Sequence, residues 1–342
     1  MKILLGISGG LDSAYSALLL RDAGHTVEAA VLNMHAYTEV DEARNTAEAL
    51  ALPFHMISCE SLFEKTVVAD FCNAYLEGKT PNPCILCNER VKFRVLYDYA
   101  MENGFDAIAT GHYAKILEKN GRFFVGMADD RSKDQSYMLY RLPQQILEKL
   151  LLPMGNIIKK EAKEDGARRG LLAADRKESQ EICFVKNEDY ADYIERVCGP
   201  SPCGDFVDEE GRVLGKHRGV IRYTVGQRKG LGISAASRLF VQDIDIPSNR
   251  ILLSGRAPKC HGFVLESPVF SGLLPEEVTE SRELSVRVRY TAPLTKAFVS
   301  QENGVLRCTF LEETHCAVTP GQSAVFYVSD HVAFGGIITK LL

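Results

Sequence analysis

The first thirteen residues constrain the fold more than any other part of this 342-residue chain. The apolar run Lys2–Ile7 predicts a buried strand that leads straight into a turn, Ser-Gly-Gly-Leu-Asp-Ser, at residues 8–13. The next residues predict a helix with apolar positions at Ala14, Ala17, Leu18 and Leu20. Glycines let the backbone approach an oxyanion, and the free amides of a helix start attract it. The pattern predicts a phosphate-binding turn, although an ordinary strand-to-helix turn has the same residues.

The turn is not a Walker phosphate loop, in which a lysine and a serine or threonine follow the last glycine. Leu11, Asp12 and Ser13 occupy those positions here. The turn resembles the SGGxDS signature of the PP-loop ATP pyrophosphatases. Those enzymes split ATP between the α- and β-phosphates and leave AMP on a carbonyl oxygen of the substrate.

The first half of the chain alternates predicted strands with predicted helices. Strands are predicted at 2–7, 26–33, 54–57 and 106–110, and helices at 40–52, 61–76, 88–102, 144–151 and 159–170. This alternation predicts an α/β fold, a parallel sheet with helices on both faces. Ligands of such sheets bind beyond the carboxyl ends of the strands, where residues 8–13 would lie.

The composition changes near Val197, after which Gly and Pro punctuate short strands. Those strands are predicted at 250–253, 284–290, 296–300, 305–311, 323–328 and 332–338. A chain of this length exceeds one hydrophobic core. We expect three domains: a PP-loop catalytic domain at 1–196, a small β-rich domain at 197–263 and a C-terminal β-barrel at 264–342.

The composition predicts a soluble globular protein, with 46% hydrophobic and 25% charged residues. No apolar run reaches the length of a membrane-spanning helix, and the apolar N-terminus is too short for a signal peptide. Ten cysteines without a signal peptide indicate reduced thiols. We therefore expect a cytoplasmic protein without a membrane partner.

The net charge of −5 argues against broad, non-specific nucleic-acid binding. Residues 211–242 nevertheless contain no acid and seven bases, Arg212, Lys216, Arg218, Arg222, Arg228, Lys229 and Arg238. This stretch indicates either a phosphate-binding surface or a solvated face balanced by the acids at 208–210.

Residues 80–88, Thr-Pro-Asn-Pro-Cys-Ile-Leu-Cys-Asn, predict a stiff loop with Asn88 as the N-cap of the following helix. Cys87 would then lie at a helix N-terminus. The helix dipole and the nearby Arg90 and Lys92 would lower the pKa of its thiol. This position predicts a reactive cysteine.

Other interpretations of the cysteines stay open. Cys87 has the ordinary fate of a free cysteine, burial in a core, as an alternative. Cys84 and Cys87 also have the spacing of half a zinc site, which Cys198 and Cys203 would complete across the domain boundary. Cys183 by itself is an apolar-flanked thiol.

Several segments follow the phosphate loop in a fixed order. They are TPNPCILCN at 80–88, TGHYA at 110–114, KDQSY at 133–137, SQEICF at 179–184, GQRKGLG at 226–232, VRY at 288–290 and PGQ at 320–322. The series resembles the tRNA-specific 2-thiouridylases, the MnmA/TrmU family, over essentially the whole chain. The resemblance implies a transferase of tRNA modification, an ATP-dependent tRNA-uridine 2-sulfurtransferase acting on the wobble uridine of anticodons.

The resemblance also implies the site of the first step, in which ATP adenylates the C2 oxygen of uridine and pyrophosphate leaves. Mg²⁺ is expected to neutralise phosphate charge, and Asp12 is expected to be catalytic. The residues implied to contact ATP are Gly6, Ile7, Ser8, Gly9, Gly10, Leu11, Asp12, Ser13, Asn33, Met34 and Gly111.

For the second step the resemblance implies that Cys183 carries a persulfide. Cys87 would be the nucleophile that frees the sulfur, leaving a transient Cys87–Cys183 disulfide. Surroundings that lower thiol pKa values suit both positions. A sulfur donor, such as a cysteine desulfurase or a relay protein, is an implied partner.

The main implied partner is tRNA, whose target base must leave the anticodon stack. The resemblance places Asn82, Pro83 and Cys84 at this base. It places tRNA contacts at His112, Lys133, Asp134, Gln135, Arg289, Tyr290 and Gln322, and it makes tRNA phosphates the expected ligands of the basic stretch, Arg228 and Lys229 included. The alternatives are a core histidine at position 112 and turn residues at 134 and 135.

Two departures from the family pattern matter. Many members carry Asp where this chain has Cys84, so Cys84, Cys87 and Cys183 could instead hold a [4Fe–4S] cluster with one open iron. Residues 33–39 are also shorter than the usual tryptophan-containing loop, and the chain has no Trp.

Two rival functions are weighed against thiolation. One is another PP-loop ligase or amidase acting on a small molecule, and the other is a non-catalytic tRNA-binding module. The β-rich second half and the pair Cys87 and Cys183 argue against the ligase, and retention of that pair argues against the module.

Overall fold

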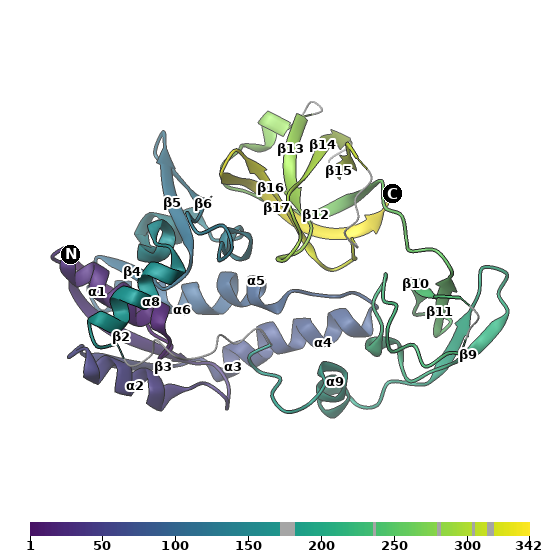
Figure 1. Cartoon of the computed structure of the whole chain (residues 1–342), viewed down its shortest axis with the longest axis horizontal. Helices are drawn as coiled ribbons and strands as arrows, with labels where there is room; N and C mark the ends of the chain where they lie inside the picture. Colours follow the sequence, from purple (N-terminus) through teal and green to yellow (C-terminus); the bar gives the residue numbers. More distant parts are fainter. Residues whose placement is uncertain (172–181, 235–236, 279–281, 303–304, 313–317) are drawn as a thin grey trace.

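The computed structural model describes residues 1–171, 182–234, 237–278, 282–302, 305–312 and 318–342. Its N-terminal domain is built on a parallel sheet in the order β3-β2-β1-β4-β7 (Figure 1). The central strand β1 is fully buried at Ile3, Leu4 and Leu5, as expected for a strand covered on both faces. The predicted α/β fold is confirmed. The strands are β1 (Lys2–Gly6), β2 (Thr26–Asn33), β3 (Phe54–Ser58), β4 (Ala107–Thr110) and β7 (Leu150–Leu151).

Helices cover this sheet and extend from it. The shorter ones are α1 (Leu11–Asp22), α2 (Val40–Ala49), α7 (Gln144–Lys149) and α8 (Lys159–Arg168). The helix predicted at 144–151 ends early, because Leu150 turns extended and the chain pairs with β4 at Ile108.

Two long helical rods run side by side toward the central domain (Figure 1). The first joins α3 (Glu60–Phe63), the π-helix η1 (Glu64–Val68) and α4 (Ala69–Leu76). The second joins α5 (Pro83–Cys87), the π-helix η2 (Asn88–Lys92) and α6 (Phe93–Glu102). The predicted N-cap at Asn88 is wrong: Asn82 caps the helix by accepting from the Cys84 amide at 3.2 Å. Pro83 is tolerated at the first helical position, because a proline there loses no helical hydrogen bond. The N-cap is therefore Asn82, six residues before the predicted Asn88.

The central domain follows α9 (Tyr190–Cys198). Its small sheet has the order β10-β11-β8-β9, in which β11 and β8 are parallel and the other pairs antiparallel. Its strands are β8 (Gly204–Val207), β9 (Val213–His217), β10 (Phe240–Asp245) and β11 (Arg250–Ser254).

The C-terminal domain is a closed antiparallel barrel, as predicted. The strand order β12-β15-β14-β13-β16-β17 closes by pairing of β17 with β12. The strands are β12 (Gly262–Phe270), β13 (Arg282–Arg287), β14 (Thr295–Glu302), β15 (Val305–Phe310), β16 (Ser323–Val328) and β17 (His331–Leu341). Short 3₁₀ helices are η3 (Ser136–Leu139), η4 (Pro153–Asn156), η6 (Val220–Arg222) and η7 (Pro275–Val278).

A hairpin of the N-terminal domain extends the barrel sheet. Strands β5 (Ala114–Lys119) and β6 (Arg122–Met127) pair with each other, and β6 pairs with β17 through Gly126 and His331. The barrel therefore lies on the catalytic domain (Figure 1). In the described ranges no helix combines the length and apolarity that a bilayer crossing requires.

Candidate active site

The phosphate loop lies between β1 and α1, at the carboxyl end of the sheet. Gly9 has φ +78°, and a Cβ there would lie 3.1 Å from the Glu42 backbone. Ser13 closes the turn: its hydroxyl oxygen accepts from the Ser8 amide at 3.3 Å and donates to the Gly10 carbonyl at 3.0 Å. The N-cap of α1 is Gly10, which has no side chain to cap the first-turn amides. Those amides are therefore available to an anionic ligand.

Gly111 packs directly on this loop. A Cβ at position 111 would lie 2.7 Å from the Ser13 nitrogen and 2.8 Å from the Asp12 carbonyl carbon. Real Cβ atoms do not approach so closely, so only glycine fits. Gly6 follows on the neighbouring strand, paired in register with Thr110.

Asp12 has two partners that sequence reasoning did not find. Lys159, the first residue of α8, places its ammonium 2.7 and 2.8 Å from the two carboxylate oxygens. The Tyr113 hydroxyl donates to Oδ1 at 2.8 Å. Tyr113 lies in the TGHYA segment, which offers a weak signal, whereas nothing in the sequence connects Lys159 with residue 12 across 147 positions.

The two residues at the end of β2 connect the nucleotide side with the cysteines. The Asn33 amide donates to the Glu60 carboxylate, and the Asn33 carbonyl accepts from the Cys59 amide at 2.9 Å. The Met34 thioether lies 3.9 Å from the Cys87 sulfur. A residue predicted at ATP therefore contacts a residue predicted in sulfur transfer.

Cys87 lies within a continuous rod and not at a helix N-terminus. Its side chain is 7% exposed, and this burial raises the pKa of the thiol to about 12, against an opposing effect of Lys92. The predicted low pKa of Cys87 is thus wrong for this structure. Its cause, a helix start at position 88, is absent because Asn82 and Pro83 start the helix earlier.

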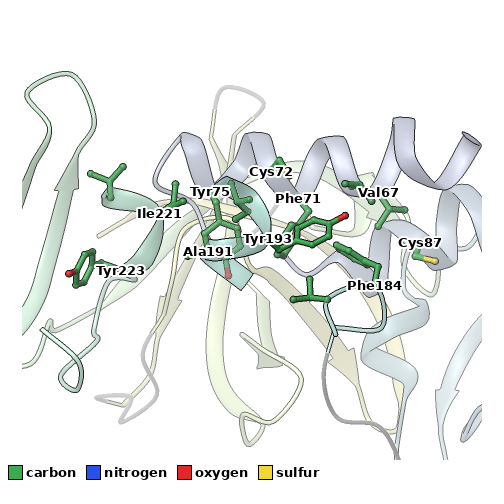
Figure 2. Packing of buried hydrophobic residues seen from close by; sticks show 14 of the residues in the cluster. Val67, Phe71, Cys72, Tyr75, Cys87, Phe184, Ala191, Tyr193, Ile221 and Tyr223 are labelled. Carbon is green, nitrogen blue, oxygen red and sulfur yellow. The ribbon is translucent and has the colours of Figure 1, made fainter. Parts of the chain in front are cut away.

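Cys183 lies on a turn closed by the Val185 amide, which donates to the Ile182 carbonyl at 3.0 Å. The thiol is exposed, whereas the next residue, Phe184, is buried. The Phe184 ring packs edge-on against Phe63, with ring centres 5.4 Å apart. It packs in the same way against Phe71 at 5.3 Å (Figure 2). The turn is thereby fixed beside the first helical rod, next to Cys87 (Figure 2).

Cys84, Cys87 and Cys183 form a cluster of thiols. The charges of Cys183 and Cys84 raise the pKa of Cys87. The charge of Cys84 also raises the pKa of Cys183. Displacement of water by protein is the larger cause and also raises the pKa of the surface thiol Cys84. Lys92 opposes the rise at all three. The predicted low pKa of Cys183 is therefore wrong as well.

Among the residues that the structure describes, the cysteines do not form a site for a single metal ion. Within the ranges described above, no three side chains of His, Cys, Asp or Glu come together as ligands. Cys84, Cys87 and Cys183 therefore do not form a site for a single ion, and a [4Fe–4S] cluster, in which each thiol would bind a different iron, stays a prediction. The zinc site predicted from Cys84, Cys87, Cys198 and Cys203 does not form among the described residues, where Cys198 hydrogen-bonds to Cys72 on α4.

Comparison with known proteins decides the family. Residues 1–187 match the tRNA methyl transferase HUP domain, 191–255 the tRNA methyl transferase PRC-barrel domain and 260–338 the aminomethyltransferase beta-barrel domain. The tRNA-specific 2-thiouridylase MnmA of Clostridium acetobutylicum is 38% identical, covering 98% of this chain and 99% of its own length. The chain belongs to the tRNA-specific 2-thiouridylase family. This confirms the predicted family and the predicted enzyme class.

Other members of the 2-thiouridylase family align equally well. The MnmA of Clostridium perfringens is 38% identical over 100% of this chain and 99% of its own, and that of Acetivibrio thermocellus is 37% identical over 98% and 99%. Among solved structures, NMN synthetase from Francisella tularensis has a TM-score of 0.35 at 17% identity over 58% of this chain and 76% of its own. That similarity is too low to indicate function.

In this 2-thiouridylase His112 follows β4 and packs against the second helical rod. Its Nδ1 and the Thr110 hydroxyl are 2.7 Å apart, and its ring packs on Phe93 at 5.4 Å. Burial, followed by the charge of Lys92, lowers the pKa of His112 to about 3. The imidazole is therefore neutral at physiological pH.

Two residues predicted to contact tRNA, Asp134 and Gln322, form hydrogen bonds that join the barrel to the N-terminal domain. Asp134 is 4% exposed, and its carboxylate accepts from the Arg287 guanidinium at 3.1 Å. Gln135 accepts from the Tyr113 amide at 2.9 Å, which favours turn roles for both residues. The Gln322 amide donates to the Thr80 carbonyl at 2.8 Å.

The remaining predicted tRNA residues have varied surroundings. Arg289 is exposed beyond β13, and the Tyr290 ring lies 6.3 Å from that of Tyr137. Lys133 is half-buried, and its amide donates to the Asp130 carbonyl. Residues 179–181 of the SQEICF segment fall outside the described ranges.

The basic stretch divides into two groups. Three members have acidic partners: Arg212 with Asp208 (2.7 Å), Lys216 with Asp205 (2.6 Å) and Arg222 with Glu195 (2.5 Å). In the part of the chain that the structure covers, no acidic side chain pairs with Arg218, Arg228, Lys229 or Arg238. Arg228 and Arg238 line a pocket of about 280 Å³ with Gly230, Leu231, Gly232, Ile233, Ser237 and Leu239.

Proposed function

We propose that the protein catalyses ATP-dependent 2-thiolation of the wobble uridine in tRNA anticodons. The observation that carries this proposal is the contact of Met34 with Cys87 at the carboxyl end of β2, beside the phosphate loop. It brings the ATP-binding end of the sheet and the thiol cluster into one region. A small-molecule ligase would need neither thiol, and a passive tRNA-binding module would need no phosphate loop.

The first step activates the base. The uridine O2 attacks the α-phosphorus of ATP, the bond to the β-phosphate breaks, and pyrophosphate leaves with its electron pair. The glycine turn and the uncapped amides of α1 supply the donors that bind the phosphates. C2 then bears AMP, which leaves more readily than oxide or hydroxide.

The second step transfers sulfur from a persulfide on Cys183. Its terminal sulfur attacks C2 and AMP leaves, which gives a C2–S–S–Cys183 linkage. The Cys87 thiolate then attacks the Cys183 sulfur and breaks the S–S bond, so that 2-thiouridine departs and a Cys87–Cys183 disulfide remains. A thiol reductant must reduce this disulfide, and a sulfur donor such as a cysteine desulfurase or a relay protein must renew the persulfide.

Because the pKa of Cys87 is raised, its thiol must lose a proton before it can act as the nucleophile. A thiol with a pKa of about 12 is protonated at neutral pH and cannot attack. Lys92 is the described cation whose charge favours the thiolates of Cys84, Cys87 and Cys183. We propose that the bound base, which lies at Asn82, Pro83 and Cys84, changes this environment when it enters.

Mg²⁺ fits as an ion that arrives with the nucleotide. Mg²⁺ is commonly held by one or two carboxylates plus substrate phosphates, and Asp12 is the carboxylate of the loop. When bound, the ion would neutralise charge on the phosphates. We propose the persulfide route, for which Cys183 as the sulfur carrier and Cys87 as the nucleophile suffice, with a [4Fe–4S] cluster on Cys84, Cys87 and Cys183 as the alternative.

The partner tRNA would extend from the thiol cluster toward the barrel and the unpaired bases Arg228 and Lys229. The target base is expected to be flipped out of the anticodon loop, because a stacked base cannot reach the phosphate loop. We place the reaction in the cytoplasm, where tRNA is available.

The proposal is tested with tRNA transcript, ATP, Mg²⁺ and a persulfide donor, by mass spectrometry of nucleosides. The Cys183→Ala and Cys87→Ser variants are expected to lose 2-thiouridine formation while retaining tRNA-stimulated pyrophosphate release. Cys203→Ser, an exposed cysteine of the central domain, is the matched control and should remain active. Thiolation by Cys183→Ala would contradict the persulfide assignment, and iron-dependent thiolation by the wild type would favour the cluster route.

A further inference from the structure

The phosphate loop has no cation of its own, yet a lysine from another helix contacts it. Asp12 is the one charged residue of positions 8–13, and its carboxylate would repel a triphosphate. The Lys159 ammonium pairs with both oxygens of that carboxylate, at 2.7 and 2.8 Å. We infer that Lys159 is a phosphate-binding residue that leaves Asp12 when ATP binds and holds the β- and γ-phosphates. The inference rests on the proposed function, because it assigns the group that binds the departing pyrophosphate.

Contacts along α1 and α8 fix the position of this lysine. The Tyr15 hydroxyl donates to Asp165 at 2.9 Å near the middle of the helices. Arg169 forms two hydrogen bonds with Asp22, at 2.7 and 2.9 Å, where both helices end. With Lys159 at the beginning, the two helices are aligned in parallel, so their N-termini lie together.

Helix stability does not explain a lysine at this position. The N-terminus of a helix carries partial positive charge, which disfavours a cation in the first turn. Two parallel N-termini concentrate that positive charge on one side of the loop. A polyanion bound there would be attracted by both helix ends and by Lys159. The single carboxylate of Asp12 neutralises this positive charge only in part.

The ion pair is placed so that it can exchange partners. The Lys159 and Asp12 side chains are 20% and 29% exposed, so solvent and ligand reach both groups. Asp12 also accepts from the Tyr113 hydroxyl at 2.8 Å, so it keeps a partner after Lys159 moves. The released carboxylate then faces the cation that accompanies ATP.

Calorimetric titration of the full chain with ATP and with AMP, without tRNA and at constant Mg²⁺, tests the inference. Lys159→Met should weaken ATP binding by at least about tenfold, the size expected for a lost charged hydrogen bond, and AMP binding by less than about twofold. Lys159→Arg should recover most of the ATP affinity. Lys160→Met is the matched control, because the neighbouring lysine is 84% exposed and points away from the loop toward Glu164.

The same experiment has contrary outcomes. Equal losses for ATP and AMP would mean that Lys159 only shapes the loop through Asp12, and unchanged ATP affinity would remove any phosphate role. If Lys159→Met does not fold, amine labelling of the wild type gives the answer: pyrophosphate should protect Lys159 relative to Lys160, and equal labelling overturns the inference. If Lys159→Met selectively loses ATP affinity but the wild type forms no 2-thiouridine, the inference on Lys159 stands and only the proposed function is contradicted.

Discussion

The sulfur of Cys87 lies 3.9 Å from the thioether of Met34, at the end of the strand beside the phosphate loop. Met34 and Cys87 are 53 positions apart; Met34 directly follows β2, and Cys87 ends α5. This contact brings the thiol cluster to the end of the sheet at which the phosphate loop lies. Its consequences for thiol reactivity lead to the first prediction.

Replacing Lys92 should raise the pKa values of the three clustered thiols. Its charge lowers the pKa of Cys84, Cys87 and Cys183 against the larger effect of burial, so Lys92→Met removes that opposition. Alkylation of Cys183 by iodoacetamide at pH 8 should slow roughly threefold, and its pH–rate curve should move to higher pH. Arg90→Met serves as control. An unchanged curve would show that Lys92 does not act on the thiols.

Replacing Gly111 should damage the phosphate loop. A methyl group at this position would lie 2.7 Å from the Ser13 nitrogen, so the start of α1 must shift. ATP affinity of Gly111→Ala should fall at least about tenfold, measured by calorimetry. Gly215→Ala, whose added methyl would lie 3.6 Å from Ile233, should bind ATP normally. Normal binding by both variants would contradict the close packing.

Breaking the ion pair between the barrel and the catalytic domain should destabilise the protein. Arg287→Met leaves the Asp134 carboxylate, which is 2% exposed, without its charged partner. The expected loss is about 3 kcal/mol in the free energy of urea unfolding. Lys296→Met removes an exposed barrel ion pair with Glu283 and should cause no measurable change. Equal stability of the two variants would refute a docking role for Asp134.

The neutral state of His112 predicts a specific acid sensitivity. Its pKa is lowered to about 3, so below pH 6.5 the unfolded chain binds a proton that the folded chain does not. Stability should therefore fall as the pH falls. Between pH 7 and pH 5, wild type should lose about 2 kcal/mol more than His112→Asn, because the unfolded imidazole gains its proton over most of this range. Parallel losses would mean that the imidazole is protonated in the fold.

The unpaired bases of the central domain should contribute to tRNA affinity through charge. The triple variant Arg228→Gln, Lys229→Gln, Arg238→Gln should bind tRNA with a salt dependence whose slope is smaller by about two. Arg212→Gln, which removes a base already paired with Asp208, should leave the slope nearly unchanged. Filter binding at several salt concentrations measures both. An unchanged slope in the triple variant would place the tRNA elsewhere.

Local sequence signals were sufficient where a single element decides the structure. The fully buried run Ile3–Leu5 and the glycines that follow predicted both the central strand and the phosphate turn. The helix start near Cys87 was less secure, because Asn82 and Asn88 are both good N-caps. Pro83 next to Asn82 decided between them, and with it the burial and the raised pKa of Cys87.

The sequence by itself determined the order of strands and helices, the phosphate turn and the family, because these depend on periodicity, turn chemistry and motifs along the chain. Only the tertiary structure decided that Lys159 reaches Asp12, that Phe184 fixes Cys183 beside Cys87, and that Asp134 binds Arg287. Those relationships join residues many positions apart through the packing of α8, α4 and the barrel. Packing also sets burial, and burial sets the pKa values on which the chemistry depends.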